Sequence, residues 1–98
     1  MGMKHYEFVF LTKPGLNQDK LKDLFSSLEK QIEKVGGKAK KKNHWGTKSL
    51  VYPIKKQHKA DFYIWQLDFN QELKLKSLNT FLNRQANIIR YLLLSKEE

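Results

Sequence analysis

Apolar and polar side chains alternate from Lys4 to Leu11, so that every second residue shares a face. One face is aromatic and carries Tyr6, Phe8 and Phe10. The opposite face mixes polar and apolar groups: His5, Glu7, Val9 and Leu11. A period of two is typical of a β-strand, and apolar groups on both faces favour a central strand. The residues at 12–15, Thr-Lys-Pro-Gly, predict its end.

The next apolar residues recur at spacings of three and four. They are Leu21, Leu24, Phe25, Leu28, Ile32 and Val35. Such a stripe predicts an amphipathic helix with one buried face. Asn17 stands where an N-cap is expected, and Asp19 adds negative charge to the first turn. The two glycines at 36–37 predict the end of the helix, because glycine adopts a left-handed C-terminal cap at little cost.

A charge run and a strand that contains proline occupy the middle of the chain. Residues 38–44 read KAKKKNH, and residues 45–54 read WGTKSLVYPI, which predicts a second strand. Pro53 cannot donate to a β-ladder, so this strand is expected at a sheet edge or a bulge, and Gly46 also fits a bulge. The basic turn expected at 55–59 would, with the proline, keep another chain from pairing with that edge.

Alternation returns at 61–69 and predicts a third strand. Tyr63, Trp65, Leu67 and Phe69 face one way, and Phe62, Ile64, Gln66 and Asp68 the other. Residues 70–83 predict a second helix, with Leu75, Leu78 and Leu82 on its inner stripe, and residues 88–94 predict a last strand. The β-α-β-β-α-β order predicts one α+β domain over residues 1–98, with a ferredoxin-like, split βαβ architecture. Its four-stranded antiparallel sheet would carry both helices on one face. The expected core is Tyr6, Phe8, Phe10, Leu21, Leu24, Phe25, Leu28, Ile32, Leu67, Leu75, Leu78 and Leu82.

Composition narrows the class of protein. The 98 residues are 40% apolar and 12% aromatic, which is enough for a packed interior. The absence of cysteine excludes a disulfide framework and a thiolate metal site. No apolar run approaches the roughly 20 residues that span a bilayer, and no signal-peptide pattern opens the chain. We therefore expect a cytoplasmic protein without a membrane partner. The 19 Lys and Arg residues outnumber the 10 Asp and Glu residues, and this net charge of +9 favours a nucleic-acid partner over a merely solubilising surface.

Catalytic and cofactor chemistry finds no support in the sequence. His5, His44 and His58 are far apart and have no carboxylate or cysteine at metal-ligand spacing, so we expect no metal. No nucleophile elbow, P-loop or dinucleotide fingerprint occurs, so we expect no enzyme activity, cofactor or small-molecule substrate. RNA recognition motifs share this topology, but residues 59–66, KADFYIWQ, lack the glycine and two of the aromatics of their third strand. Phe62 and Ile64 on the open face, with Val9 and Leu92 expected beside them, are better explained as a protein-binding patch.

Three segments together resemble one family. Lys-His-Tyr-Glu at 4–7, Trp-Gly-x-x-x-Leu-x-Tyr-Pro-Ile at 45–54 and Asn-Ile-Ile-Arg-Tyr at 87–91 are similar to bacterial-type ribosomal small-subunit protein six. The family often has two basic residues after the Trp-Gly pair, where this chain has Thr47 and Lys48. The resemblance implies a structural constituent of the small ribosomal subunit. It would bind small-subunit (16S-type) ribosomal RNA in the central domain, together with small-subunit protein eighteen as its protein partner.

Two sets of site residues follow from the charge pattern and the resemblance. Phosphate contacts are expected from Lys4, His5, Lys48, Lys55, Lys56, Lys59 and Arg90. Arg90 has the strongest individual claim, because a guanidinium group can bind two oxygens at once. A protein-docking surface is expected at Trp45, Val51, Phe62 and Ile64; the alternative for Trp45 is that it caps the end of the core. The alternative interpretation of the whole chain is an independent RNA-binding or regulatory module of ferredoxin-like fold.

Overall fold

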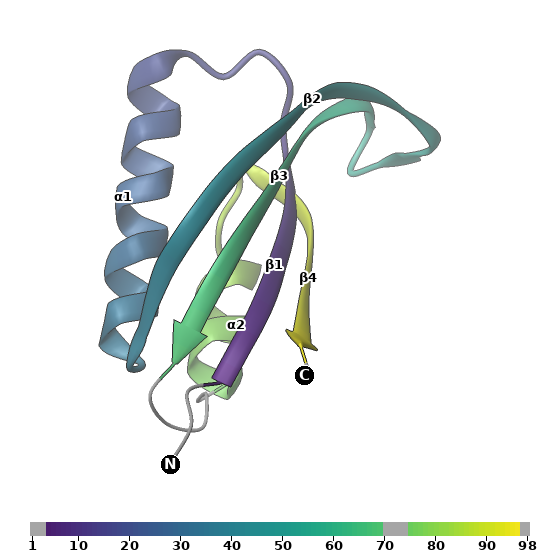
Figure 1. The fold of residues 1–98 in the computed structure, drawn as a ribbon. Helices are drawn as coiled ribbons and strands as arrows, with labels where there is room; N and C mark the ends of the chain where they lie inside the picture. The colour runs from purple at the N-terminus through teal and green to yellow at the C-terminus, as the bar shows by residue number, and fades with distance from the viewer. Residues whose placement is uncertain (1–3, 70–74, 97–98) are drawn as a thin grey trace.

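The computed structural model describes residues 4–69 and 75–96, which form a four-stranded sheet and two helices (Figure 1). In chain order the elements are β1 (Lys4–Thr12), α1 (Gln18–Lys34), β2 (Gly37–Ile54), β3 (Gln57–Phe69), α2 (Leu75–Asn83) and β4 (Ile88–Lys96). The strands lie in the order β2-β3-β1-β4, and neighbouring strands are antiparallel. This topology confirms the expected ferredoxin-like fold, with β1 inside the sheet and β2 at an edge.

Both helices pack on the sheet face that carries the aromatic side chains of β1. Phe8 and Phe10 are almost completely buried there, beside Tyr63 and Trp65 of β3. The ring centroid of Phe10 lies 5.3 Å from that of Tyr63 and 5.3 Å from that of Trp65. The helices add Leu24, Leu28, Ile32, Leu78 and Leu82 to the same cluster. The opposite face of the sheet carries no helix among the described residues, and we call it the open face.

The predicted core is largely confirmed. Tyr6, Leu21 and Phe25 pack against the buried cluster but stay partly exposed. The side chain of Leu75 lies outside the described residues, as do residues 70–74, the first part of the expected second helix. Val35, Tyr63, Trp65, Phe69 and Ile88 extend the core beyond the expected set.

Helix α1 begins and ends where its local signals place it. The Asn17 side chain accepts a hydrogen bond from the backbone N–H of Lys20 at 2.8 Å, so it satisfies one of the free donors of the first turn. At the other end Val35 is the C-cap, and Gly36 follows with φ of +89°. A residue with a β-carbon would be strained in that conformation, which explains the glycine.

The expectation that residues 38–44 precede the second strand is wrong. Strand β2 begins at Gly37 and runs for 18 residues, so the whole charge run is part of it. Most of its side chains are exposed because β2 is an edge strand whose order comes from backbone pairing with β3. Such a strand shows no apolar alternation. Strand β3 likewise begins at Gln57, earlier than expected, and β4 continues to Lys96.

The pairing of β2 with β3 is interrupted three times. The register shifts between Ala39 and Lys41, between His44 and Gly46, and between Ser49 and Ile54. Gly46 has φ of +95°, as expected for a glycine at a bulge. The strand that contains Pro53 is thus both at an edge and irregular, as the proline predicts.

Candidate functional site

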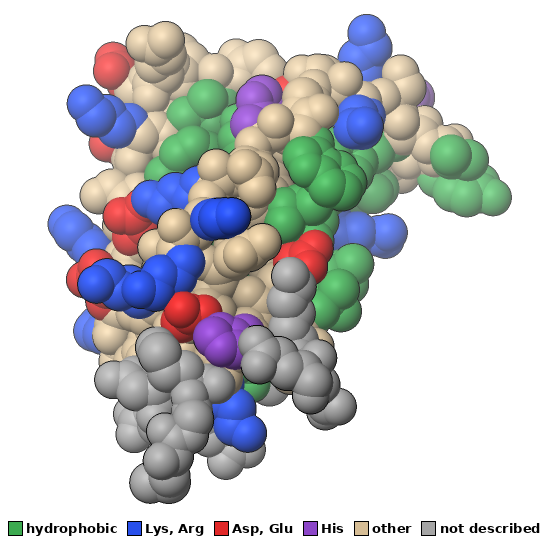
Figure 2. Space-filling view, viewed as in Figure 1, with side chains coloured by type: hydrophobic (Ala, Val, Ile, Leu, Met, Phe, Trp, Pro, Cys, Tyr) green, Lys and Arg blue, Asp and Glu red, His purple; other side chains and the backbone are tan. Residues whose placement is uncertain are grey.

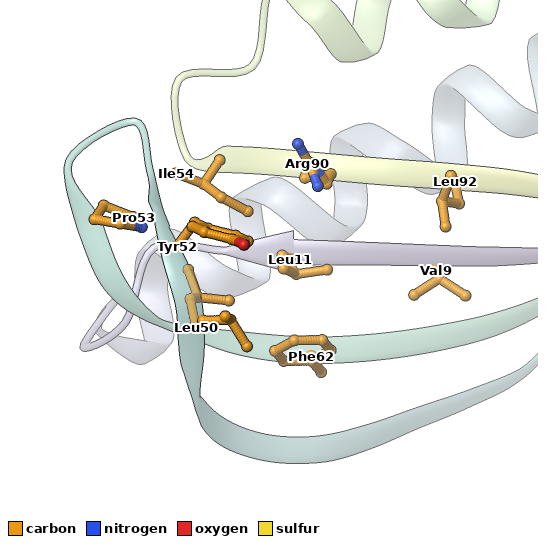
Figure 3. Close-up of a pocket in the computed structure, with 10 residues that line it drawn as sticks. Val9, Leu11, Leu50, Tyr52, Pro53, Ile54, Phe62, Arg90 and Leu92 are labelled. Carbon is orange, nitrogen blue, oxygen red and sulfur yellow. The ribbon is translucent and has the colours of Figure 1, made fainter.

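An apolar groove of about 430 Å³ lies on the open face beside the β2–β3 hairpin. Its floor comes from three strands, through Val9 and Leu11 of β1, Phe62 of β3, and Arg90 and Leu92 of β4. Its wall is the end of β2, residues 50–54, which arches over the sheet (Figure 3). The side chains of Leu50, Tyr52 and Ile54 are turned toward this floor.

The arch exists because β2 leaves its ladder before the hairpin. Between Ser49 and Ile54 the register with β3 is lost, and Pro53 in this stretch has no N–H to restore it. Leu50 and Ile54 pack against a small buried cluster on the open face, formed by Leu11, Ala60 and Ile89. Val51 and Tyr52 remain 90% and 77% exposed, so apolar surface is left uncovered at the rim.

The four side chains expected to dock a protein partner are not all placed alike. Val51 and Phe62 line the groove. Trp45 is also exposed but stands outside the lining, with the Lys48 ammonium 5.9 Å from its ring centroid. The expectation that Ile64 is exposed is wrong, because only 7% of it is accessible. It lies between two strands, paired with Val9 of β1 and with Asn43 of β2.

Other groove residues escaped the sequence reasoning. Leu11, Leu50 and Tyr52 line the groove but were not expected at the docking surface. Leu92, which was expected beside Phe62 on the open face, also lines the groove and is 55% exposed. The alternation of β4 puts Leu92 on the same face as Arg90. Figure 2 shows hydrophobic side chains gathered over this part of the molecule, near the hairpin.

Several of the expected RNA-binding side chains are brought together at the hairpin end of the sheet. The Lys55 ammonium donates to the backbone carbonyl of Ile88 at 3.3 Å, which joins the hairpin turn to β4. Lys55 and Arg90 line the same second hollow, of about 230 Å³, and Arg90 also belongs to the apolar groove. Lys56 is the next residue of the turn. Lys59 follows in β3, where it pairs with Ser49 of β2.

The expected contacts at the start of β1 lie at the other end of the sheet. Lys4 pairs with Phe69 and His5 with Asp68, at the end of β3 farthest from the hairpin. The His5 Nδ1 lies 2.6 Å from an Asp68 carboxylate oxygen, so this imidazole already has a polar partner. The structure therefore divides the expected RNA-binding residues between two ends of the sheet.

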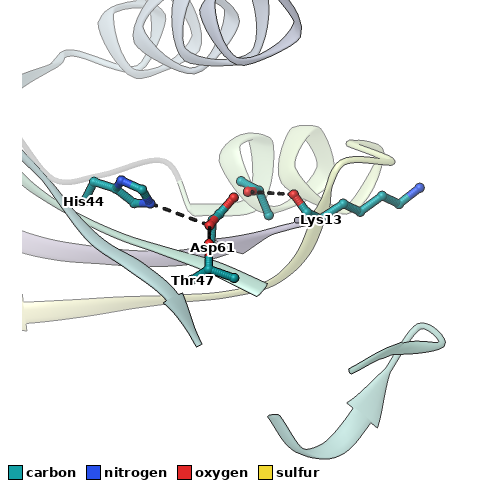
Figure 4. Close-up of polar contacts among 5 residues, drawn as sticks. Lys13, His44, Thr47 and Asp61 are labelled. Carbon is teal, nitrogen blue, oxygen red and sulfur yellow. Dashed lines mark hydrogen bonds and ion pairs between the residues drawn. The ribbon is translucent and has the colours of Figure 1, made fainter. Parts of the chain in front are cut away.

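A buried carboxylate that the sequence reasoning missed holds β2 to β3. The Thr47 hydroxyl donates to Asp61, and the His44 Nε2 lies 3.7 Å from the same carboxylate (Figure 4). The His44 ring stacks on Tyr63 with centroids 4.5 Å apart. Burial raises the pKa of the Tyr63 phenol, and the negative charge of Asp61 raises it further. Thr47 stands where the resemblance leads one to expect a basic residue, and here it is a structural hydrogen-bond donor.

The described residues hold no group of three or more His, Cys, Asp or Glu side chains that could bind a metal ion. Neither described helix is long and apolar enough to cross a membrane. Over residues 4–69 and 75–96 the surface offers an apolar groove with basic side chains beside it, and this arrangement is suited to binding.

Comparison with known proteins gives a consistent result. The family model for ribosomal protein S6 matches residues 5–95. The small ribosomal subunit protein bS6 of Dictyoglomus turgidum is 30% identical over 98 residues, covering 98% of this chain and 100% of that protein. The bS6 protein of Vesicomyosocius okutanii is 34% identical over 102 residues, covering 98% of this chain and 83% of that protein. The crystal structure of 30S ribosomal protein S6 from Thermotoga maritima shares the fold, with a TM-score of 0.84 and 24% identity, over 97% of this chain and 89% of that one.

Proposed function

Because the chain belongs to the ribosomal protein S6 family, we propose that it binds small-subunit ribosomal RNA in the central domain together with small-subunit protein eighteen. The chain is a protein of the small ribosomal subunit, and its family is structural and has no enzymatic activity. Its place in the cell is the ribosome, in the cytoplasm.

The observation that carries the proposal is the position of Arg90. Its side chain lines the apolar groove and also the hollow that contains Lys55. A protein segment seated in the groove would therefore lie directly beside a phosphate backbone held by Arg90 and the lysines of the hairpin turn. The binding surfaces for the partner and for the RNA would thus adjoin at Arg90, which supports joint binding.

The protein partner and the RNA are expected to be bound by different kinds of interaction. The partner would cover the exposed apolar side chains at the rim, and the backbone groups near Ser49 and Val51 would receive an extended segment of it. The RNA would be held mainly by phosphate contacts, whose strength falls steeply with salt. The two contributions can therefore be tested separately.

The docking test replaces two groove residues that are more than half exposed. Val51→Ser with Leu92→Ser should lower the affinity for small-subunit protein eighteen at least about tenfold, or ~1.4 kcal/mol, by calorimetric titration. Leu94→Ser is the matched control, because Leu94 is 50% exposed but stands outside the groove lining. If the double variant stays folded and binds the partner as well as the control does, the docking surface lies elsewhere.

The RNA test replaces Lys55, Lys56 and Lys59 by glutamine. The slope of log affinity against log salt should fall by about 2 to 3 units for a labelled central-domain transcript, because each lost phosphate contact removes about 0.7 to 0.9 units. Replacement of Lys20, Lys22 and Lys30 on α1 gives the same change of net charge on the helical layer and should leave the slope nearly unchanged. An equal loss in both triple variants would show that net charge alone acts.

Co-sedimentation separates the ribosomal function from an independent RNA-binding module. The protein should sediment with the small subunit at low and at moderate salt. A protein that binds the transcript but stays in the supernatant at moderate salt would be such a module instead.

A further inference from the structure

Three lysines of β2 form an exposed basic arm, which we define as Lys38, Lys40 and Lys41. All three side chains are exposed, and none of them makes an ion pair with another described residue. Their neighbour Lys42 differs, because it pairs with Glu29 of α1 and lies 5.0 Å from the centroid of the Trp65 ring. Within residues 4–69 and 75–96, no ion pair therefore offsets the positive charge of the arm.

The register fixes where these side chains stand. Lys38 is opposite Asp68 and Lys41 is opposite Gln66, and both of these β3 residues lie on the open face. Lys40 is the extra residue of the first bulge. Two described carboxylates near the arm are already engaged: Asp68, opposite Lys38, pairs with His5, and Glu29 pairs with Lys42, the neighbour of Lys41. Figure 2 shows Lys and Arg side chains on this side of the molecule, with acidic side chains among them.

Protection of a free edge explains these lysines only in part. Charged side chains do keep edge strands from pairing with other chains. This edge, however, is already interrupted by three shifts of register and by Pro53. Three further lysines within four residues exceed what such protection needs.

We propose that the basic arm is a second phosphate-binding surface for the same ribosomal RNA, separate from the hairpin turn. This inference rests on the proposed function. The arm and the turn stand at opposite ends of an 18-residue strand, in a molecule 43 Å long. An RNA segment held at both places would extend over the length of the sheet. Because the arm offers ammonium groups only, it positions the RNA backbone and does not read base sequence.

The test replaces Lys38, Lys40 and Lys41 by glutamine and measures binding of the labelled central-domain transcript over a range of salt, with small-subunit protein eighteen present. The salt slope should fall by about 2 to 3 units relative to the α1 triple variant of equal net charge. Arginine at the same three positions should keep the full slope, because the charge is retained. The midpoint of thermal unfolding should stay within the range of the α1 control.

The outcomes separate this inference from the proposed function. If the unaltered protein shows no salt-dependent binding of the transcript, the proposed function fails and this inference fails with it. If the hairpin variant loses slope and the arm variant matches the α1 control, the proposed function stands and the second surface does not exist. If the arm variant keeps its slope but dimerises in solution, the lysines serve only to protect the edge, which also overturns the inference.

Discussion

The turn between β2 and β3 places two lysines in a backbone conformation that favours glycine. Lys55 has φ of +48° and Lys56 has φ of +65°, and they join Ile54 to Gln57 as a two-residue hairpin loop. Hairpins of this type prefer Asn-Gly or Asp-Gly at these positions. We therefore predict that Lys56→Gly stabilises the protein. Lys55 is left in place because its ammonium group bonds to Ile88.

The magnitude follows from two opposing terms. The left-handed conformation costs a residue with a β-carbon about 1–2 kcal/mol. Glycine avoids this strain but loses more conformational entropy on folding, which costs about 0.5–1 kcal/mol. The net gain is about 0.5–1 kcal/mol, which raises the melting temperature of a domain of this size by about 2–8 °C.

Thermal unfolding followed by circular dichroism measures this shift, and Lys56→Val provides the opposite control. A β-branched residue is a genuine outlier at positive φ, so the valine variant should melt below the unaltered protein. In the RNA titration, Lys56→Gly should also lose about 0.7 to 0.9 units of salt slope. If glycine lowers the melting temperature while valine leaves it unchanged, the turn is not strained and the reasoning is wrong.

Three further predictions concern the core. Phe8→Ala should cost about 3–5 kcal/mol in urea unfolding, and a loss below about 1 kcal/mol would mean that the faces of β1 are reversed. Gly37→Ala should cost about 1–3 kcal/mol, because a β-carbon there would overlap the buried ring of Phe69; Phe69→Leu should relieve part of that cost in a double-mutant cycle. The pKa of Tyr63 is higher in the folded than in the unfolded protein, so the protonated phenol stabilises the fold. This contribution to the free energy of unfolding is complete below the unfolded pKa of ~10 and is lost as the pH rises through the higher folded pKa. Stability should therefore fall less steeply with alkaline pH in Tyr63→Phe, and an identical slope would contradict the raised pKa.

Local signals sufficed for the first half of the fold. The bounds of α1 depend on a cap, an apolar stripe and a glycine that are neighbours in sequence, and each acts where it stands. The start of β2 could not be found in this way. Its lysines are exposed on an edge, so this part of the strand exists because the far end of β3 supplies hydrogen bonds, and Gly37 pairs with Phe69, which is remote from it in sequence.

In the candidate site, too, some features depend on neighbours in sequence and others on residues of other strands. The basic turn and the exposure of Val51 follow from residues 51–59 alone. The burial of Ile64 depends on its neighbours on two other strands, and the role of Asp61 depends on Thr47 and His44 across the ladder. The groove itself arises where β2 leaves its ladder and arches over the sheet, which no periodicity records.

That arch has a consequence for local opening of the native state. Between Ser49 and Ile54 the ladder with β3 is broken, and the buried cluster beneath the arch has three residues among those that the structure describes. Segments with few buried contacts open with a free energy far below that of global unfolding, so their amides exchange with solvent early. The amides of residues 50–52 are therefore expected to exchange quickly, whereas those of β1 wait for the whole molecule to unfold. A partner seated in the groove would slow exchange at the arch first, and hydrogen exchange would then record docking as local protection.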